Sequence, residues 1–175
     1  EESSPVGQDF LARLCQKWEQ AAAEKPAATR LVVLRIGIVL SSQGGALAKM
    51  LPVFRAGFGG PIGSGQQWMS WIERGDLCRI IQTSLEADSW SGVINAVAPA
   101  PVTMAVFAGS LGRCLGRPSL LPVPGPMLQL LLGDGSKVVL EGQFVSSSRL
   151  EALGFNFLCP TLPVALDVAT SSSNR

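Results

Sequence analysis

The chain has 175 residues, of which 47% are hydrophobic and 15% are charged, and its formal net charge is +1. This length and composition are typical of a well-buried globular domain and exclude a disordered chain. The near-neutral charge leaves no electrostatic footprint for nucleic acid, and no apolar run approaches the roughly 18 residues of a membrane-spanning helix.

The first third of the chain predicts a helix, a strand and a second helix. Residues 9–24 carry an apolar stripe at helical spacing, and Asp9 can cap that helix. Residues 30–40 form an almost continuous apolar run rich in β-branched side chains, which is typical of a strand covered on both faces in a parallel sheet. After a glycine turn, helical spacing returns in four side chains: Leu47, Met50, Leu51 and Phe54.

A glycine-rich loop, residues 57–65, separates this second helix from a short aromatic strand at 67–72. The loop holds five glycines in nine positions, so its backbone needs unusual dihedral angles or a close approach to another group. Residues 76–87 then predict a helix, with Asp76 as its cap. We expect its inward face to be Leu77, Ile80, Ile81, Ser84 and Leu85.

A short strand at 92–95 precedes a helix that Thr103 caps and that ends at 116–118. Leu120–Pro126 then has three prolines in seven residues, and the alternating pattern of helices and strands ends here.

The last part of the chain is dominated by helices. We expect a small helix at 126–132, and the segment 137–140 fits either a strand or a helix. Two short helices close the chain, one capped near Ser146 and stopped by Gly154, the other starting at Thr161. The second of these buries Leu162, Ala165, Leu166 and Ala169.

Helices and strands alternate early and helices dominate late, which indicates an α/β fold with a helical appendage. A doubly wound sheet needs more strands than the two or three that the chain clearly holds, so we expect the missing strands to lie before residue 1. The chain also starts without Met, inside a polar stretch, which favours the back part of a longer protein.

Cysteine, histidine and tyrosine restrict the chemistry of the chain. The four cysteines, at 15, 78, 114 and 159, have neither metal-ligand nor redox spacing, so we expect small buried hydrophobes in a reducing compartment. Histidine and tyrosine are absent. The commonest general base, the commonest metal ligand and the phenol acid are therefore missing, and no metal site is predicted.

Several collinear segments resemble the C-terminal portion of an atypical extended short-chain dehydrogenase/reductase. The branch is the epimerase-like one that ends in a small domain of unknown function and includes SulA-like chloroplast proteins. The matching segments are Glu2-Ser-Ser-Pro-Val-Gly-Gln-Asp-Phe-Leu, Leu34-Arg-Ile-Gly-Ile-Val-Leu, Gly44-Gly-Ala-Leu-Ala-Lys-Met-Leu, Gly59-Gly-Pro-Ile-Gly-Ser-Gly-Gln-Gln-Trp, Asn95-Ala-Val-Ala-Pro, Arg117-Pro-Ser-Leu-Leu-Pro-Val-Pro and Leu140-Glu-Gly-Gln.

The resemblance implies the C-terminal half of a Rossmann-type, doubly wound parallel sheet over residues 1–118. A small, mostly helical C-terminal domain would follow over 119–170, with a frayed tail at 171–175. The family binds NADP or NAD at the carboxyl ends of its strands, on a glycine-rich turn that we expect upstream of this chain. The resemblance also implies a chloroplast location, with the cytoplasm as the alternative.

Three positions are implied to lie near the nicotinamide end of the cofactor. Arg35 matches such a position in relatives, and Gly37 and Ile38 follow it along the strand. A structural ion pair is the alternative role for Arg35.

The proton-transfer pair of this superfamily is missing from the chain. Its enzymes use a Tyr-x-x-x-Lys pair, whose spacing puts both side chains on one helix face. Aligned through Glu19, these positions fall at Leu11 and Cys15, which cannot supply the same chemistry. We expect both side chains to be core.

The substrate side departs from the family as well. Members that act on nucleotide sugars carry an arginine after the glycine loop to hold a diphosphate, and Met69 stands there instead. An apolar or aromatic ligand fits Trp68 and Met69 better, with Gln66 and Gln67 offering amide contacts at the pocket mouth. Core packing of these aromatic-strand residues is the alternative. Alternation should turn Trp68 and Ser70 to one face, and Met69 and Trp71 to the other.

Glu73 stands where the family has histidine, which makes it the candidate functional carboxylate. A solvated pair of Glu73 with Arg74 is the simpler alternative.

Two functions remain open at this stage. The first is an NAD(P)-binding, oxidoreductase- or epimerase-like protein that takes a small-molecule ligand, of which this chain is the substrate-side portion. The second is a catalytically silent descendant that binds a protein partner, for example in plastid division or assembly.

Overall fold

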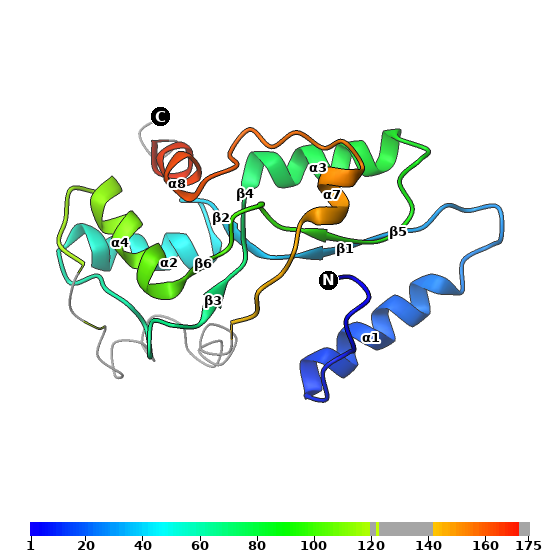
Figure 1. The fold of residues 1–175 in the computed structure, drawn as a ribbon, viewed down its shortest axis with the longest axis horizontal. Coiled ribbons are helices and arrows are strands. Elements are labelled where there is room, and N and C mark those ends of the chain that lie inside the picture. The colour runs from blue at the N-terminus through cyan, green and yellow to red at the C-terminus, as the bar shows by residue number, and fades with distance from the viewer. Residues whose placement is uncertain (120–121, 123–141, 172–175) are drawn as a thin grey trace.

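Helices and short strands alternate along the first part of the chain in the computed structural model, as the sequence pattern predicts (Figure 1). The structure describes residues 1–119, 122 and 142–171. The segments predicted at 126–132 and 137–140 lie outside these residues, as does the tail beyond residue 171. In chain order the elements are α1 (Phe10–Ala23), β1 (Val32–Ile36), β2 (Ile38–Leu40), α2 (Gly45–Arg55), β3 (Trp68–Met69), β4 (Trp71–Glu73), α3 (Arg74–Glu86), β5 (Gly92–Ala96), β6 (Val102–Thr103), α4 (Met104–Cys114), α7 (Ser148–Ala152) and α8 (Leu162–Ser171).

Two pairs of parallel strands form the centre of the fold. β1 runs beside β5, and β2 runs beside β4. β3 and β6 form a third pair, which is antiparallel. Parallel pairing needs a crossover between the paired strands, and α2 lies in the crossover between β2 and β4. These features confirm the α/β class.

The single strand predicted for 30–40 is wrong in two respects. The chain changes partner at Gly37, whose N–H donates to the Ala96 carbonyl at 3.2 Å, while the next N–H, of Ile38, donates to the Ser70 carbonyl at 2.8 Å. The run is also not covered on both faces, because no residue of β1 is fully buried. Among the residues that the structure describes, β5 is the one strand paired with β1, so the other edge of β1 is open.

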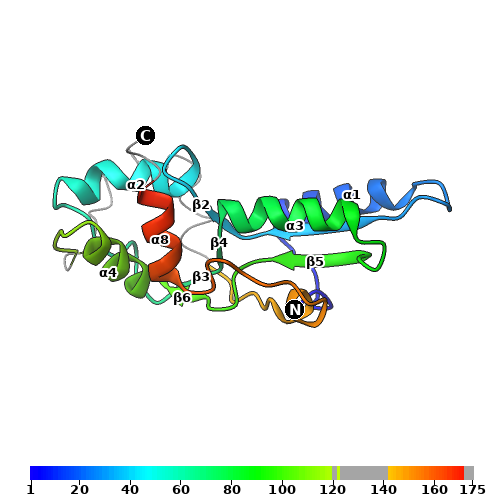
Figure 2. The same cartoon turned by 90° about the horizontal axis from the view of Figure 1, so that it is seen from above.

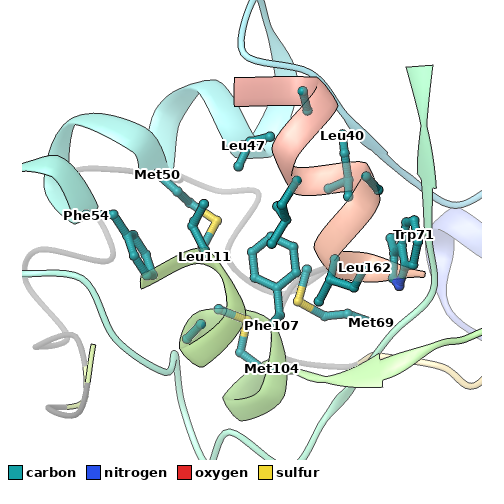
Figure 3. Packing of buried hydrophobic residues seen from close by; sticks show 14 of the residues in the cluster. Leu40, Leu47, Met50, Phe54, Met69, Trp71, Met104, Phe107, Leu111 and Leu162 are labelled. Atoms are coloured by element: carbon teal, nitrogen blue, oxygen red, sulfur yellow. The ribbon is translucent and has the colours of Figure 1, made fainter. Parts of the chain in front are cut away.

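One apolar cluster joins α2, α4 and α8 to the strands β2, β3 and β4 (Figure 3). Phe107 and Leu111 of α4 face Leu162 of α8 across this cluster. The inward faces predicted for the second helix and for the last helix are confirmed. All eight of their side chains are buried: Leu47, Met50, Leu51, Phe54, Leu162, Ala165, Leu166 and Ala169.

A second apolar cluster packs α3 and α7 against β4 and β5. It is built around Ile80 of α3, Ile94 of β5 and Leu150 of α7. The inward face predicted for α3 is wrong in part, because Ile81 is 40% exposed and Leu85 is 74% exposed. Asp76, Ile80 and Ser84 are the buried residues, and positions one step beyond them on a helix point about 100° away.

Helix α1 begins as predicted, with the Asp9 carboxylate accepting from Ala12 N–H at 2.9 Å. No residue of α1 is buried, and Phe10 and Trp18 are 77% and 66% exposed. The helix lies on the opposite side of β1 and β5 from α3 (Figures 1 and 2). The apolar stripe of α1 therefore has no covering layer within the described part of the chain.

The cysteines depart from their prediction. Cys15, Cys78 and Cys114 are exposed, because each lies on a helix face turned away from the two apolar clusters. Cys159 is buried, and this burial raises the pKa of its thiol.

The described part of the segment 119–170 contributes to both apolar clusters, through Leu150 of α7 and Leu162 of α8. The domain boundary at residue 118 remains a prediction. No helix in the described ranges combines the length and the apolar character needed to cross a bilayer.

Candidate functional site

Two neighbouring cavities lie between α1 and the carboxyl end of β1. The larger has a volume of about 680 Å³ and the smaller about 310 Å³, and they share lining residues from α1, from the end of β1 and from residues 143–145. The carboxyl end of a parallel strand is where α/β folds place their ligands. The larger cavity is lined by Asp9, Phe10, Leu11, Ala12, Cys15, Ile36, Gly37, Ile38, Trp68, Met69, Ser70, Gly142, Gln143 and Val145.

Arg35 lines the smaller cavity and is already engaged by two partners. Its guanidinium donates to both carboxylate oxygens of Glu19 at 2.8 Å and to the Glu2 carbonyl at 3.1 Å. This bidentate pair lowers the pKa of Glu19 and raises the pKa of Arg35. The ion pair, which is the structural alternative for Arg35, also fixes α1 to β1.

Gly37 stands where the chain passes from one strand partner to the next, and both cavities include it. A Cβ atom at this position would lie 2.6 Å from the Ser70 carbonyl oxygen and 2.7 Å from the Val97 side chain. The glycine is needed for this close approach of three segments. Ile38, the next residue, also lines the larger cavity.

Leu11 and Cys15 line the larger cavity, so the expectation that they are core is wrong. Leu11 is 52% exposed, and Cys15 is exposed as well. The four-residue spacing places both on one face of α1, as it would a tyrosine and a lysine. The two positions that the resemblance implies for the proton-transfer pair therefore face the cavity.

Trp68 and Met69 both line the larger cavity but differ in exposure. Trp68 is 40% exposed, whereas Met69 is 2% exposed and belongs to the first apolar cluster. Trp71 is fully buried in the same cluster and donates its indole N–H to the Ala100 carbonyl at 3.0 Å. The alternation predicted for this segment holds for Trp68, Met69 and Trp71.

Gln66 and Gln67 directly follow the glycine loop and lie outside the described lining of the two cavities. The Gln67 amide donates to the Ile62 carbonyl at 2.8 Å and accepts from the Ser64 hydroxyl at 3.3 Å. Gly65 of this loop has a φ of +72°, which fits the predicted need for unusual dihedral angles. These contacts stabilise the loop itself.

Glu73 takes the capping role that the sequence predicts for Asp76. Glu73 is the N-cap of α3, where its carboxylate accepts from Gly75 N–H at 2.5 Å and from Asp76 N–H at 3.1 Å. The solvated pair with Arg74 is wrong, because Glu73 is only 7% exposed and Arg74 donates to the Gln43 side chain.

Asp76, 1% exposed, is not the cap. Its carboxylate accepts from Leu158 N–H at 3.0 Å, from Cys159 N–H at 2.8 Å and from Arg79 at 2.9 Å. It therefore connects α3 to the segment that leads into α8.

Sequence reasoning missed residues 142–145 and the side chain that holds them. The Ser70 hydroxyl donates to the Gln143 carbonyl at 2.7 Å and accepts from Val145 N–H at 2.9 Å. A helix–strand pattern carries no signal for a contact that spans 73 residues. The burial of Ser70, 8% exposed on a strand face where a polar side chain needs a partner, is the feature that reveals it.

Comparison with known proteins defines the class. A family model described as "Domain of unknown function (DUF1731)" matches residues 123–169. The crystal structure of human epimerase family protein SDR39U1 (isoform 2) with NADPH is similar at a TM-score of 0.90 and 43% identity. The match covers 97% of this chain and 58% of that one. The fold is thus that of the Rossmann-type, NAD(P)-dependent epimerase class.

Two further relatives support the assignment. The epimerase family protein SDR39U1 homolog, chloroplastic, of Arabidopsis thaliana is 49% identical over 157 residues, which cover 90% of this chain and 45% of that protein. The crystal structure of the nucleoside-diphosphate sugar epimerase from Corynebacterium glutamicum is 31% identical, with a TM-score of 0.73. That match covers 97% of this chain and 33% of the other.

The chain belongs to this epimerase family, an extended short-chain dehydrogenase/reductase branch that carries the domain of unknown function. The resemblance of its sequence motifs to that family is confirmed. The chain spans about half the length of the relatives that it matches.

Proposed function

We propose that this chain forms the substrate-side wall of the dinucleotide site in an epimerase-like oxidoreductase that binds NADP or NAD. One observation carries the proposal. The larger cavity at the carboxyl end of β1 brings Gly37 and Ile38 together with Trp68 and Met69, although these pairs are about thirty residues apart in the sequence. The human relative solved with NADPH supports the choice of cofactor.

The residues present fit the nicotinamide end of such a cofactor. Ile36, 50% exposed and shared by both cavities, offers an apolar surface to a flat ring. Gly37 places bare backbone beside it. Glu19 already binds the Arg35 guanidinium, so the role of Arg35 is to fix α1 against β1 at the edge of the cavity. When bound, the dinucleotide supplies hydride transfer.

Turnover needs a proton donor or acceptor beyond Leu11 and Cys15. Of the described residues that line the larger cavity, Asp9 is the one with a carboxylate, and Asp9 already caps α1. Glu73, the other candidate, caps α3 and does not line this cavity. We infer that any acid or base for the reaction lies outside the described lining of this cavity.

Calorimetric titration of the intact protein with NADPH and with NADH tests the proposal. We expect binding of at least one of the two, weakened at least tenfold by Ile36→Glu, because the new carboxylate would stand on the cavity wall. Ile81→Glu is the matched control, since Ile81 is 40% exposed on α3 and lies outside the cavity. Absence of binding heat with both dinucleotides would overturn the proposal.

The second candidate is a catalytically silent protein that acts by binding a partner. Leu11 and Cys15, exposed toward the cavity in place of the proton-transfer pair, favour it. Under this hypothesis, Ile36→Glu protein that no longer binds dinucleotide still retains its partner in pull-downs, and no reduction of carbonyl compounds is detected. A partner lost together with dinucleotide binding would count against a role independent of the cofactor.

We also propose a chloroplast location, which the chloroplastic name of the Arabidopsis relative supports. A fluorescent fusion of the intact protein tests it. Signal confined to the cytoplasm would contradict it.

A further inference from the structure

Residues 142–145 run along both cavities and close one side of them. Gln143 and Val145 line both cavities, Gly142 lines the larger one, and Phe144 lines the smaller one. These four residues, which we name the strap, lie inside the range that the family model matches, residues 123–169. The domain of unknown function thus contributes directly to the cavity wall.

Three independent contacts hold the strap in place. The buried Ser70 hydroxyl bonds to the backbone on both sides of Phe144, at the Gln143 carbonyl and the Val145 N–H. Gly142 packs so closely on the backbone of Trp68 that a Cβ atom there would lie 1.8 Å from the Trp68 carbonyl oxygen. The rings of Trp68 and Phe144 meet edge to face with their centroids 5.0 Å apart.

The described walls of the larger cavity are largely apolar. Phe10, Leu11, Ile36 and Trp68 are each at least 40% exposed there. Its described lining contains no lysine or arginine. Arg35 lines the smaller, neighbouring cavity, but its guanidinium already forms an ion pair with Glu19. Phosphate and diphosphate groups need cationic donors, so this lining disfavours them, whereas a flat uncharged ring can cover the apolar side chains.

We propose that the larger cavity binds an uncharged substrate with a flat apolar ring, and that the strap is the wall that selects it. The inference rests on the proposed function, because it takes this cavity as the substrate side of the dinucleotide site. Trp68 is the side chain that contacts the ring. Ser70 and Gly142 are positioning residues, since they act by holding the strap.

The test uses intact protein and two probes, 2-naphthol and UDP-glucose, followed by saturation-transfer NMR with and without NADPH. We expect 2-naphthol to bind and UDP-glucose to give no transfer. Trp68→Ala and Gly142→Ala should each weaken 2-naphthol binding at least tenfold. Gly44→Ala is the control for Gly142→Ala, because a Cβ atom at Gly44 meets nothing within 4 Å. Ser70→Ala provides a milder second disruption of the strap.

The outcomes separate this inference from the proposed function. UDP-glucose binding, or 2-naphthol binding that neither Trp68→Ala nor Gly142→Ala changes, would overturn the inference while NADPH binding leaves the proposed function standing. If Gly142→Ala fails to fold, as judged by its thermal melt, Trp68→Ala and Ser70→Ala decide the matter. Loss of NADPH binding in the unsubstituted protein would overturn the proposed function, and the 2-naphthol arm without NADPH still tests the cavity.

Discussion

Asp76 shows how a single buried carboxylate ties distant segments together. Both of its oxygens are occupied, by two N–H groups 82 and 83 residues away and by the neighbouring Arg79. Losing such a group is costly, because its buried N–H partners would have no water molecule to accept their hydrogen bonds. In the sequence alone, Asp76 stands at the start of a helical pattern and therefore looks like an ordinary N-cap residue.

We expect Asp76→Asn to lower the free energy of unfolding by about 2–3 kcal/mol, because an amide N–H₂ would face a buried N–H donor. Urea denaturation measures the change. Asp88→Asn is the matched control, since Asp88 is exposed beyond the end of α3 and should change stability by less than about 0.5 kcal/mol. Equal effects of the two substitutions would contradict the role of Asp76.

The Glu19–Arg35 pair makes the docking of α1 depend on pH. Because the pKa of Glu19 is lowered in the folded chain, the pair contributes fully above its ordinary pKa of 4.5 and loses that contribution as pH falls through the lowered value. Both side chains are about a third exposed, which limits the contribution to about 1 kcal/mol or less. We expect Glu19→Gln to be less stable than the unsubstituted protein at pH 7, with the difference shrinking as the pH falls below 4.5. A difference that is unchanged by pH in thermal melts would show that the charge is not responsible.

At the scale of elements, helices were predictable where one face meets a core. α2 and α8 bury all the side chains that their spacing indicates. The strand at 30–40 was not predictable, because its division at Gly37 depends on where β4 and β5 begin, and no local pattern carries that information.

Gly37 is the point where this division can be tested. We expect Gly37→Ala to lower stability by about 1–3 kcal/mol, because the added methyl group would overlap the Ser70 carbonyl and the Val97 side chain. Thermal unfolding measures it, with Gly44→Ala as the control in open space. A Gly37→Ala protein as stable as the control would show that the strands can separate at little cost.

At the scale of the whole molecule, α1, β1 and β5 lie at one end of the fold, away from α2, α4 and α8 (Figures 1 and 2). Among the described residues, one edge of β1 has no strand beside it. Large apolar side chains gathered on one helix, together with an unpaired strand edge, promote association. This arrangement explains why the apolar stripe of 9–24 correctly predicts a helix but does not form part of a core.

We expect the isolated 175-residue chain to associate with rising concentration, and Phe10→Ser with Trp18→Ser to reduce that association. Leu85→Ser is the control, because Leu85 is 74% exposed on α3, away from α1. Sedimentation velocity measures the size distribution. A monomer at every concentration, or an equal effect of Leu85→Ser, would contradict this expectation.

By itself, the sequence determined the α/β class, most of the helices, the caps Asp9 and Thr103, the family, and the absence of tyrosine and histidine. These features rest on local periodicity and on residue identity, which need no tertiary information. Only the tertiary structure decided that Glu73 caps α3 while Asp76 bridges to Cys159, that Leu11 and Cys15 face a cavity, and that the strap closes its side. Each of these depends on which distant backbone N–H or carbonyl group a side chain meets, and that is set by the packing of the two apolar clusters.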